Sequence, residues 1–289
     1  MDGKVIGFYG GKFLPLHLGH IYSILYAASR CDELHVFLFT NSYNEEKNIS
    51  ESKFPKDLLK PDIRELILKY EFENYGNVFT HTIDCKEAFK NLNKDGWDYC
   101  SSEVLDKAKV LPTVIFSSEV EQEKHFKLIY PFAKFELIDR DRLMFNINST
   151  KIRLEGAFSN WDYLPRSYKA LCSRSIVVLG EKKIRERLIS DLSKIFMTSC
   201  VDKIEECKED DVRKKVFEAR YKSNKIFFIN SADAADDKYI SFYKINNYRF
   251  SINFSEEDVR KYDSINLNGE YSKILYQGIS RVRSIILNH

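Results

Sequence analysis

The sequence predicts an α/β protein made of two successive domains, each built on a parallel sheet. Apolar, β-branched or aromatic runs of strand length alternate with longer segments of helical period, which is the pattern of repeated strand and helix units. The chain has 289 residues, more than a single hydrophobic core usually supports. In addition, a glycine-containing loop and a helical pattern follow the first apolar run, an order typical of open parallel sheets.

In the first domain we expect five strands, each followed by a helix. The strands are predicted over residues 4–9, 34–40, 78–83, 113–117 and 135–138, and the helices over 18–30, 61–75, 101–109, 120–130 and 149–156. This alternation places helices on both faces of the sheet and ligands at the carboxyl ends of its strands.

A second, smaller series of elements begins near residue 175. Strands are predicted over 175–179, 225–229 and 248–254, with a helix after Gly180 that ends at Phe196 and a closing helix over 271–287. The segment 158–174 between the two series contains a proline and mixes polar with apolar residues. We therefore expect one domain over residues 1–171 and another over 172–289.

The charge balance argues against a nucleic acid or a membrane surface as partner. Lys and Arg number 45 against 43 Asp and Glu, so the net charge is only +2 and any anion must be bound locally. There is no apolar run long enough for a signal peptide or a membrane span. We expect a cytoplasmic protein.

The cysteines show no metal or redox motif. They stand at positions 31, 85, 100, 172, 200 and 207, without a C-x-x-C pair and without a tight cluster with His. We expect small core residues or free thiols and no resident metal ion.

The stretch GGKFLPLHLGH at residues 10–20 has the composition of an anion-binding loop. Gly10 and Gly11 let the backbone approach a ligand closely, and the helix that follows directs its free N–H groups at the loop. His17 and His20 are three residues apart at that helix start, so both rings can reach one anion, and Lys12 adds a mobile positive charge.

Taken alone, the two histidines would be explained more simply by packing or capping, and a zinc site would need further ligands. The whole string changes this interpretation. Residues 11–20, GKFLPLHLGH, match every fixed position of G-x-F-x-P-x-H-x-G-H. This is how the chain resembles the HxGH nucleotidyltransferase family.

A second stretch, INSTKIR at residues 147–153, resembles that family's other signature, [IV]-S-x-T-x-I-R. Asn148 stands at the serine position, and an amide can still cap a helix. Arg153 carries a fork-shaped positive charge that suits a polyphosphate. The alternative is an ordinary helix cap with a solvated arginine.

Within the family the chain resembles the NadR type, in which a nicotinamide mononucleotide (NMN) adenylyltransferase domain precedes a ribosylnicotinamide kinase domain. The resemblance covers most of the length and includes GKF at 11–13, DELHV at 32–36, DGW at 95–97, FSSE at 116–119, FN at 145–146 and W-x-Y-x-P at 161–165. It implies a Rossmann-like nucleotidyltransferase domain that transfers AMP from ATP to NMN, giving NAD and pyrophosphate, with Mg²⁺ arriving on ATP.

The resemblance also implies roles for individual residues. His17 and His20 would contact the ATP phosphates, and Lys12 and Arg153 the triphosphate as a whole. Further ATP contacts are expected from Gly10, Gly11, Phe13, Gly19, Ser117, Ser118, Glu119, Asn148, Ser149 and Thr150.

For NMN, we assign Trp97 and Tyr9. The nicotinamide ring is a flat cation that favours an indole face, and Trp97 follows Asp-Gly in an expected loop. A buried tryptophan that only packs is the alternative.

The second domain resembles a P-loop kinase that has lost its P-loop. A kinase of this family would carry G-x-x-x-x-G-K-[ST] after the first strand, but the residues from Gly180 on read GEKKIRER. The family's acidic F-I-D-x-D appears as FINSA at 228–232, so both carboxylates are missing. We therefore expect no ribosylnicotinamide kinase activity, and a domain kept for structure, for contacts in a homo-oligomer or for ligand sensing.

Other functions stay open at this point. The signatures report the adenylyl donor, so the acceptor could be nicotinate mononucleotide, pantetheine phosphate or flavin mononucleotide instead of NMN. A sensor that binds ATP or NAD without turnover is the alternative from a different class.

Overall fold

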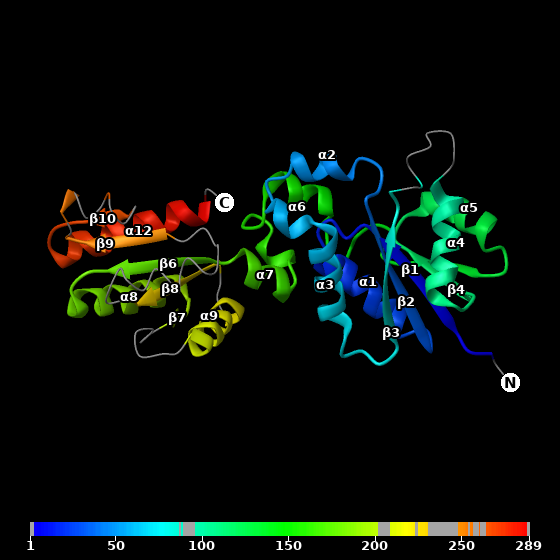
Figure 1. Ribbon diagram of the computed structural model, residues 1–289, viewed down its shortest axis with the longest axis horizontal. Helices are drawn as coiled ribbons and strands as arrows, with labels where there is room; N and C mark the ends of the chain where they lie inside the picture. The colour runs from blue at the N-terminus through cyan, green and yellow to red at the C-terminus, as the bar shows by residue number, and fades with distance from the viewer. Residues whose placement is uncertain are drawn as a thin grey trace. The chain divides into compact units, whose positions relative to one another are not determined.

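A computed structural model of the chain describes residues 3–86, 88, 96–201, 209–222, 225–230, 248–253, 255–256, 260 and 264–287. The chain divides into two compact units, Met1–Pro165 and Arg166–His289. Each unit contains one five-stranded sheet whose strands all run parallel (Figure 1). The α/β fold class predicted from the sequence is therefore confirmed.

The sheet of the first unit has the strand order β3-β2-β1-β4-β5. This order reverses direction at β1, so the carboxyl ends of β1 and β4 flank a crevice of the kind that binds nucleotides in Rossmann-like sheets. All five predicted strands are present, as β1 (Ile6–Gly11), β2 (Glu33–Thr40), β3 (Val78–Asp84), β4 (Val114–Ser117) and β5 (Lys134–Leu137).

Helices cover both faces of this sheet (Figure 1). Helices α1 (Leu18–Ala28) and α3 (Pro61–Phe72) pack on one face, and α4 (Gly96–Ala108) and α5 (Glu123–Ile129) on the other. Side chains of α4 join Phe8, Phe37 and Ile115 of the sheet in one buried cluster. The shorter elements are α2 (Glu45–Ser50), η1 (Lys56–Leu59), η2 (Val120–Gln122), α6 (Ser149–Glu155) and η3 (Trp161–Tyr163).

The first strand differs from its prediction because it extends through both glycines. Gly10 and Gly11 pair with Phe37 and Leu38 of β2, so the loop begins two residues later than expected. A β-carbon on Gly10 would lie only 2.6 Å from the ring of Phe39. Glycine is therefore required at this position by the close approach of a β2 side chain.

Two helix predictions also need correction. The helix expected over 120–130 is divided into η2 and α5, because hydrogen bonds among Ser117, Glu119 and Gln122 hold a tight turn after β4. The helix expected over 101–109 begins earlier, at Gly96. Trp97 therefore lies in the first turn of α4 and not in a loop, and its side chain is outside the described part of the structure.

A buried ion pair supports the loop after β1. The guanidinium of Arg64, in α3, pairs with the carboxylate of Glu45 in α2, and both side chains are almost fully buried. Arg64 Nη1 also donates to the backbone oxygen of Lys12 at 2.6 Å. The carboxylate of Glu45 accepts further hydrogen bonds from the backbone N–H and the hydroxyl of Ser42. The pair thereby links three segments that are distant in sequence.

Two histidines lie against each other on β2 and β3. His35 Nδ1 and His81 Nε2 are 2.9 Å apart, and the two rings are stacked at an angle of 7°. The rings of Phe8, Phe37 and Phe79 surround His35. Burial, together with the neighbouring His35, lowers the pKa of His81 to about 4, and burial also lowers the pKa of His35.

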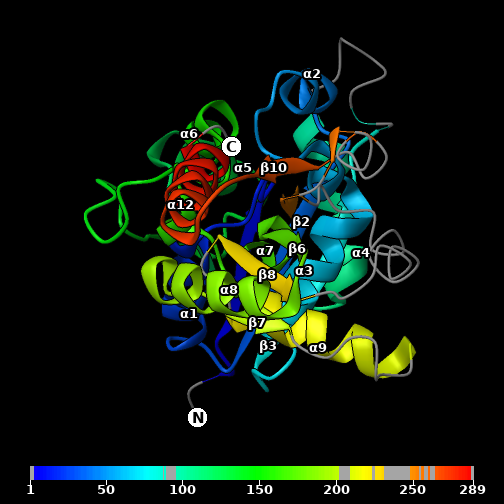
Figure 2. The same cartoon turned by 90° about the vertical axis from the view of Figure 1, so that its left-hand side faces the viewer.

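The sheet of the second unit has the order β10-β9-β6-β8-β7. Helices α8 and α12 pack together and bury their apolar side chains against β6, β8, β9 and β10 (Figure 2). The strands are β6 (Arg174–Leu179), β7 (Cys200–Val201), β8 (Ile226–Asn230), β9 (Tyr248–Ile252) and β10 (Ile265–Leu267), and the helices are α7 (Arg166–Cys172), α8 (Lys182–Phe196), α9 (Glu209–Lys222) and α12 (Tyr271–Leu287).

The segment expected to be a linker is largely structured. It contains η3 and α7, and α7 packs against α9 of the second unit. The division between the two compact units falls between Pro165 and Arg166. In the described ranges, none of the helices combines the length and the apolar character that a membrane span requires.

Loss of the buried ion pair should destabilise the first unit. We expect Arg64→Ala to lower the free energy of unfolding by about 3–5 kcal/mol, because it leaves the Glu45 carboxylate buried without its partner. Both tryptophans of the chain, Trp97 and Trp161, lie in the first unit, so tryptophan fluorescence in a urea titration reports this unit alone. The control is Glu51→Ala, which removes the exposed pair with Lys47 and should change stability by less than about 1 kcal/mol. Equal effects of the two variants would contradict this assignment.

The histidine pair should make the first unit sensitive to acid. His81 stays neutral in the folded state down to about pH 4, whereas a histidine in the unfolded chain takes up a proton near pH 6.5. The unfolded state therefore binds more protons between these values, and stability falls as the pH falls through this window. The measurement is the urea midpoint between pH 7 and pH 4.5. His81→Asn should show a shallower decline than the wild type; identical slopes for the two proteins would contradict the prediction.

Candidate active site

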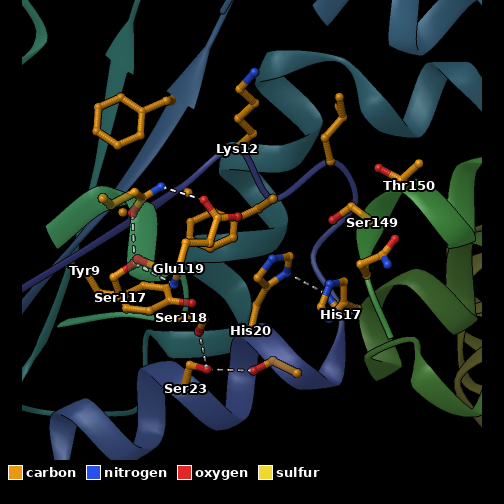
Figure 3. Close-up of a pocket in the computed structure, with 18 of the residues that line it drawn as sticks. Tyr9, Lys12, His17, His20, Ser23, Ser117, Ser118, Glu119, Ser149 and Thr150 are labelled. Atoms are coloured by element: carbon orange, nitrogen blue, oxygen red, sulfur yellow. Dashed lines mark hydrogen bonds between the residues drawn. The ribbon is translucent and has the colours of Figure 1, made fainter. Parts of the chain in front are cut away.

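A cavity of about 540 Å³ opens at the carboxyl ends of β1 and β4, a size that suits a nucleotide. Every site residue predicted from the sequence whose side chain is described lines it, and several of them are labelled in Figure 3. These residues are Tyr9, Gly10, Gly11, Lys12, Phe13, His17, Gly19, His20, Ser117, Ser118, Glu119, Asn148, Ser149, Thr150 and Arg153.

The two histidines of the first signature are stacked at the start of α1. His17 is the N-cap residue of the helix, and its backbone N–H donates to Nδ1 of His20. The ring centroids are 3.7 Å apart, with 23° between the ring planes. The ring of Phe13 meets His20 edge-on at 5.1 Å. The pair is thus held rigidly beside the free N–H groups of the first turn of α1.

Both histidines are neutral near physiological pH. Burial, followed by the positive charge of Arg142, lowers the pKa of His17 to about 3, and burial lowers the pKa of His20 well below its usual range. Only 5% of His17 is exposed, and its Nδ1 atom has no hydrogen-bond partner among the described residues.

The second signature forms α6 much as expected. Asn148 Oδ1 accepts from the backbone N–H of Lys151 at 2.8 Å, so the asparagine that replaces the family's serine still caps the helix. Ser149 Oγ donates to the backbone oxygen of Pro15 at 3.0 Å, and Arg153 Nη1 donates to that of Leu14 at 2.6 Å. These two hydrogen bonds join signatures that are more than a hundred residues apart in the sequence.

Part of the guanidinium of Arg153 is used by the protein itself. Besides its bond to Leu14, it donates through Nη2 to the hydroxyl of Thr150 at 3.1 Å. Partial burial lowers its pKa from the usual value, which for an arginine leaves the charge in place at neutral pH. The side chain of Lys12 is exposed, and its amine donates to the Tyr43 backbone oxygen at 3.3 Å.

The turn after β4 and the end of β1 form another part of the lining. The hydroxyl of Ser117 donates to Gln122 Oε1 and accepts from the backbone N–H of Glu119, so it holds the turn. Ser118 and Ser23 both contact the hydroxyl of Tyr9, whose pKa is raised by burial. Figure 3 shows the paired histidines between this turn and Ser149.

Sequence reasoning missed several lining residues. Arg142 and Asp139 lie in the loop before the second signature, where both have positive φ angles. Asp139 accepts hydrogen bonds from the backbone N–H groups of Leu143 and Met144 and so shapes this loop. The charged string DRDR at 139–142 resembles an ordinary solvated loop, and no spacing in it points to the cavity.

Cys85 and Cys100 also line the cavity and were expected to be only core residues or free thiols. With respect to metals, no group of three or more His, Cys, Asp or Glu side chains in the described ranges is placed to hold an ion. Glu119 and Asp139 are the acidic residues that line the cavity.

Comparisons with known proteins give relatives that match parts of the chain, whereas no family model matches it. It is 27% identical over 201 residues to the trifunctional NAD biosynthesis/regulator protein NadR of Escherichia coli (strain K12), an alignment that covers 68% of this chain and 48% of NadR. It is also 35% identical over 96 residues to a probable nicotinate-nucleotide adenylyltransferase of Clostridium botulinum (strain Alaska E43 / Type E3), covering 30% of this chain and 46% of that protein. The chain thus spans about half the length of these relatives.

Among solved structures, a crystal structure of NadR protein in complex with NR superposes with a TM-score of 0.73. The match covers 98% of this chain and 96% of that one, at 16% sequence identity, and it shows that the fold is shared. The sequence match over 201 residues makes this chain a homologue of the NadR proteins.

Proposed function

We propose that this protein is an adenylyltransferase of NAD biosynthesis that transfers AMP from ATP to NMN and releases pyrophosphate. The observation that carries the proposal is the meeting of the two signatures at one cavity, where Ser149 and Arg153 bond the backbone of Leu14 and Pro15. The names of the relatives, NadR and nicotinate-nucleotide adenylyltransferase, support the same class of reaction.

In such a transfer a phosphate oxygen of the mononucleotide attacks the α-phosphorus of ATP. The attacking phosphate is already ionised at neutral pH, so the protein need not supply a general base. The rate enhancement must instead come from positioning the two substrates and from stabilising the charge on the α-phosphoryl group and the leaving pyrophosphate. A site of hydrogen-bond donors and positive charges is suited to this task.

His17 and His20 would provide such donors. As neutral rings they can each donate one N–H to a phosphate oxygen, and an anion bound beside them would raise their pKa values toward the charged form. The first turn of α1 adds backbone N–H groups and the positive end of the helix dipole. In this proposal the stacked pair would lie beside the phosphate oxygens on which charge develops during the transfer.

Lys12 and Arg153 would hold the triphosphate, with Ser149 and Thr150 beside it. The amine of Lys12 is free to follow the leaving pyrophosphate, whereas Arg153 is fixed by its bonds to Leu14 and Thr150. Mg²⁺ would be carried in by ATP and would neutralise phosphate charge there. The small number of carboxylates lining the cavity fits an ion that keeps most of its ligands from ATP and water.

For the acceptor, we retain Tyr9 and Trp97 as candidate contacts. The ring of Tyr9 lines the cavity and is nearly parallel to that of Phe13, with 6.3 Å between the centroids. NMN and nicotinate mononucleotide differ only in an amide against a carboxylate on the ring. Both acceptors therefore have to be compared directly.

We also propose that the second unit has no kinase activity. Arg185 is almost fully buried at the start of α8, where it donates from Nη1 to the Gly180 backbone oxygen at 2.8 Å and from Nε to Asn230 at 2.5 Å. These contacts lie at the carboxyl ends of β6 and β8, where a ligand would bind in a parallel sheet. The arginine side chain thus takes space beside the loop, and Asn230 stands where the family has a carboxylate.

The main test is direct formation of a dinucleotide. The purified chain is incubated with ATP, Mg²⁺ and either NMN or nicotinate mononucleotide, and the product is separated by chromatography. We expect NAD to form from NMN, and we expect kcat/KM to be higher for NMN than for nicotinate mononucleotide. Failure to form a dinucleotide with either acceptor would refute the proposed function, and a preference for nicotinate mononucleotide would correct the substrate.

Loss of the second histidine should affect turnover more than binding. His20→Ala is expected to lower kcat by at least about a hundredfold, the scale of one lost electrostatic contact to a transition state. The matched control is His125→Ala on α5, which does not line the cavity and should keep wild-type turnover. The melting temperature of each variant shows whether the fold is intact. If the His20→Ala enzyme is folded and its kcat falls by less than about threefold, the assigned role is contradicted.

The inactivity of the second unit is tested with nicotinamide riboside as substrate. In the presence of ATP and Mg²⁺ we expect neither NMN nor NAD above the level without protein, because the phosphate-binding loop is absent and Arg185 lies beside its position. NAD formation from added NMN in a parallel reaction shows that the preparation is active. Phosphorylation of the riboside by the same preparation would overturn this prediction.

A further inference from the structure

Two cysteines that are distant in sequence meet in the wall of the cavity. Cys85 directly follows β3, Cys100 lies in α4, and their sulfur atoms are 3.4 Å apart. Both side chains are buried, with 2% and 8% of the residues exposed. Both also line the cavity, so a small molecule that enters the site can reach them.

We propose that Cys85 and Cys100 form a modification site, a dithiol that peroxides convert to an intramolecular disulfide. The effect on catalysis rests on the proposed adenylyltransferase function, whereas the formation of the bond does not. No motif in the sequence indicates this pair, because fourteen residues separate the two cysteines and only the fold brings them together.

The geometry requires little movement. A disulfide has its sulfur atoms about 2.05 Å apart, and the two thiols are already in hydrogen-bonding contact. The backbone N–H of Cys85 bonds the Thr40 oxygen at the end of β2, which fixes this cysteine to the sheet. The movement that brings the two sulfur atoms to bonding distance should therefore occur mainly in Cys100 and α4.

The hydrogen bond between the thiols assigns different roles to the two sulfurs. Either sulfur can be the donor in this hydrogen bond. The bond lowers the pKa of Cys100 and raises that of Cys85, so Cys100 is the sulfur that more readily becomes a thiolate. Cys100 is therefore the thiolate that attacks a peroxide oxygen, giving a sulfenic acid and water. The sulfur of Cys85 then attacks the Cys100 sulfur, the S–S bond forms and a second water leaves. Two thiols and one hydrogen peroxide thus yield one disulfide and two waters.

Two other described cysteines are less suited to this reaction. Cys31 donates to the Ala27 backbone oxygen, and burial raises its pKa to about 11. Burial raises the pKa of Cys172 to about 12. Because the thiolate is the reactive form, both should react with peroxide more slowly than Cys100.

Oxidation should affect the acceptor more than ATP. The bond would tie α4 to the end of β3, and Trp97, our candidate contact for the nicotinamide ring, is one helical turn before Cys100. A displacement of about 1 Å is enough to change turnover by roughly a hundredfold when it misplaces a substrate. The residues proposed to hold the ATP phosphates lie in the loop after β1, at the start of α1 and in α6, and none of them belongs to β3 or α4.

The test begins with a peptide map. The reduced full-length protein is treated with hydrogen peroxide, free thiols are blocked, and the unreduced digest is analysed by mass spectrometry. We expect a peptide linked through Cys85 and Cys100 in the wild type and in the control Cys31→Ser, and no such peptide in Cys85→Ser or Cys100→Ser. Free thiols, or separate sulfinic acids at the two positions in a protein that remains folded, would overturn the proposal.

The effect on the enzyme is measured on the same samples, each compared with its own reduced form. We expect oxidation to raise the KM for NMN at least about tenfold in the wild type and Cys31→Ser, with recovery on addition of dithiothreitol. Both cysteine-pair variants should show no such change. An unchanged KM in a fully disulfide-linked wild type would refute the effect on the acceptor. If the reduced protein makes no dinucleotide, the proposed function fails, and the peptide map alone decides whether the dithiol site exists.

Discussion

The site depends on the hydrogen bonds that the backbone carbonyl groups of the loop after β1 accept from side chains. This loop leaves the sheet while still buried, so its carbonyl groups must find donors inside the protein. Three side chains from distant parts of the chain provide them: Arg64 of α3 bonds the oxygen of Lys12, and Arg153 and Ser149 of α6 bond those of Leu14 and Pro15. The same contacts bring α6 to the cavity, and the ion pair with Glu45 keeps Arg64 in place. The same hydrogen bonds therefore fix the conformation of the loop and hold the two signatures together.

The two units show how the residues after a first strand decide what a parallel sheet can bind. In the first unit, two glycines and the start of α1 leave a cavity bordered by neutral histidines. In the second unit, Gly180 leads into a helix whose Arg185 bonds the backbone of that glycine and the side chain of Asn230. Both sheets are five-stranded and parallel. The difference lies in which side chains occupy the space at their carboxyl ends.

The electrostatics of the cavity are set mainly by burial. His17, His20 and Tyr9 all have pKa values shifted toward the neutral form because the uncharged state costs less away from water. The positive charge of Arg142 reinforces this effect on the histidines. The cavity thus combines neutral hydrogen-bond donors from the histidines with the positive charges of Arg142 and Arg153, a combination suited to an anion. The cysteine pair shows the opposite effect, because the hydrogen bond to Cys85 lowers the pKa of Cys100 and so favours its charged form.

The sequence by itself determined the fold class, the order of the strands along the first unit and most of the cavity lining, whereas the short strands β7 and β10 were not predicted. Alternating apolar patterns are local, and the two signatures are contiguous strings, so both can be recognised without coordinates. Helix α2 was not anticipated because its polar residues have no apolar period, and Trp97 was assigned to a loop because Asp-Gly is a strong turn signal. Only the tertiary structure decided that Arg142 reaches the cavity, that Arg185 fills the second loop, and that Cys85 lies against Cys100. The physical reason is that these contacts join residues from separate elements, and their partners are chosen by packing and not by spacing along the chain.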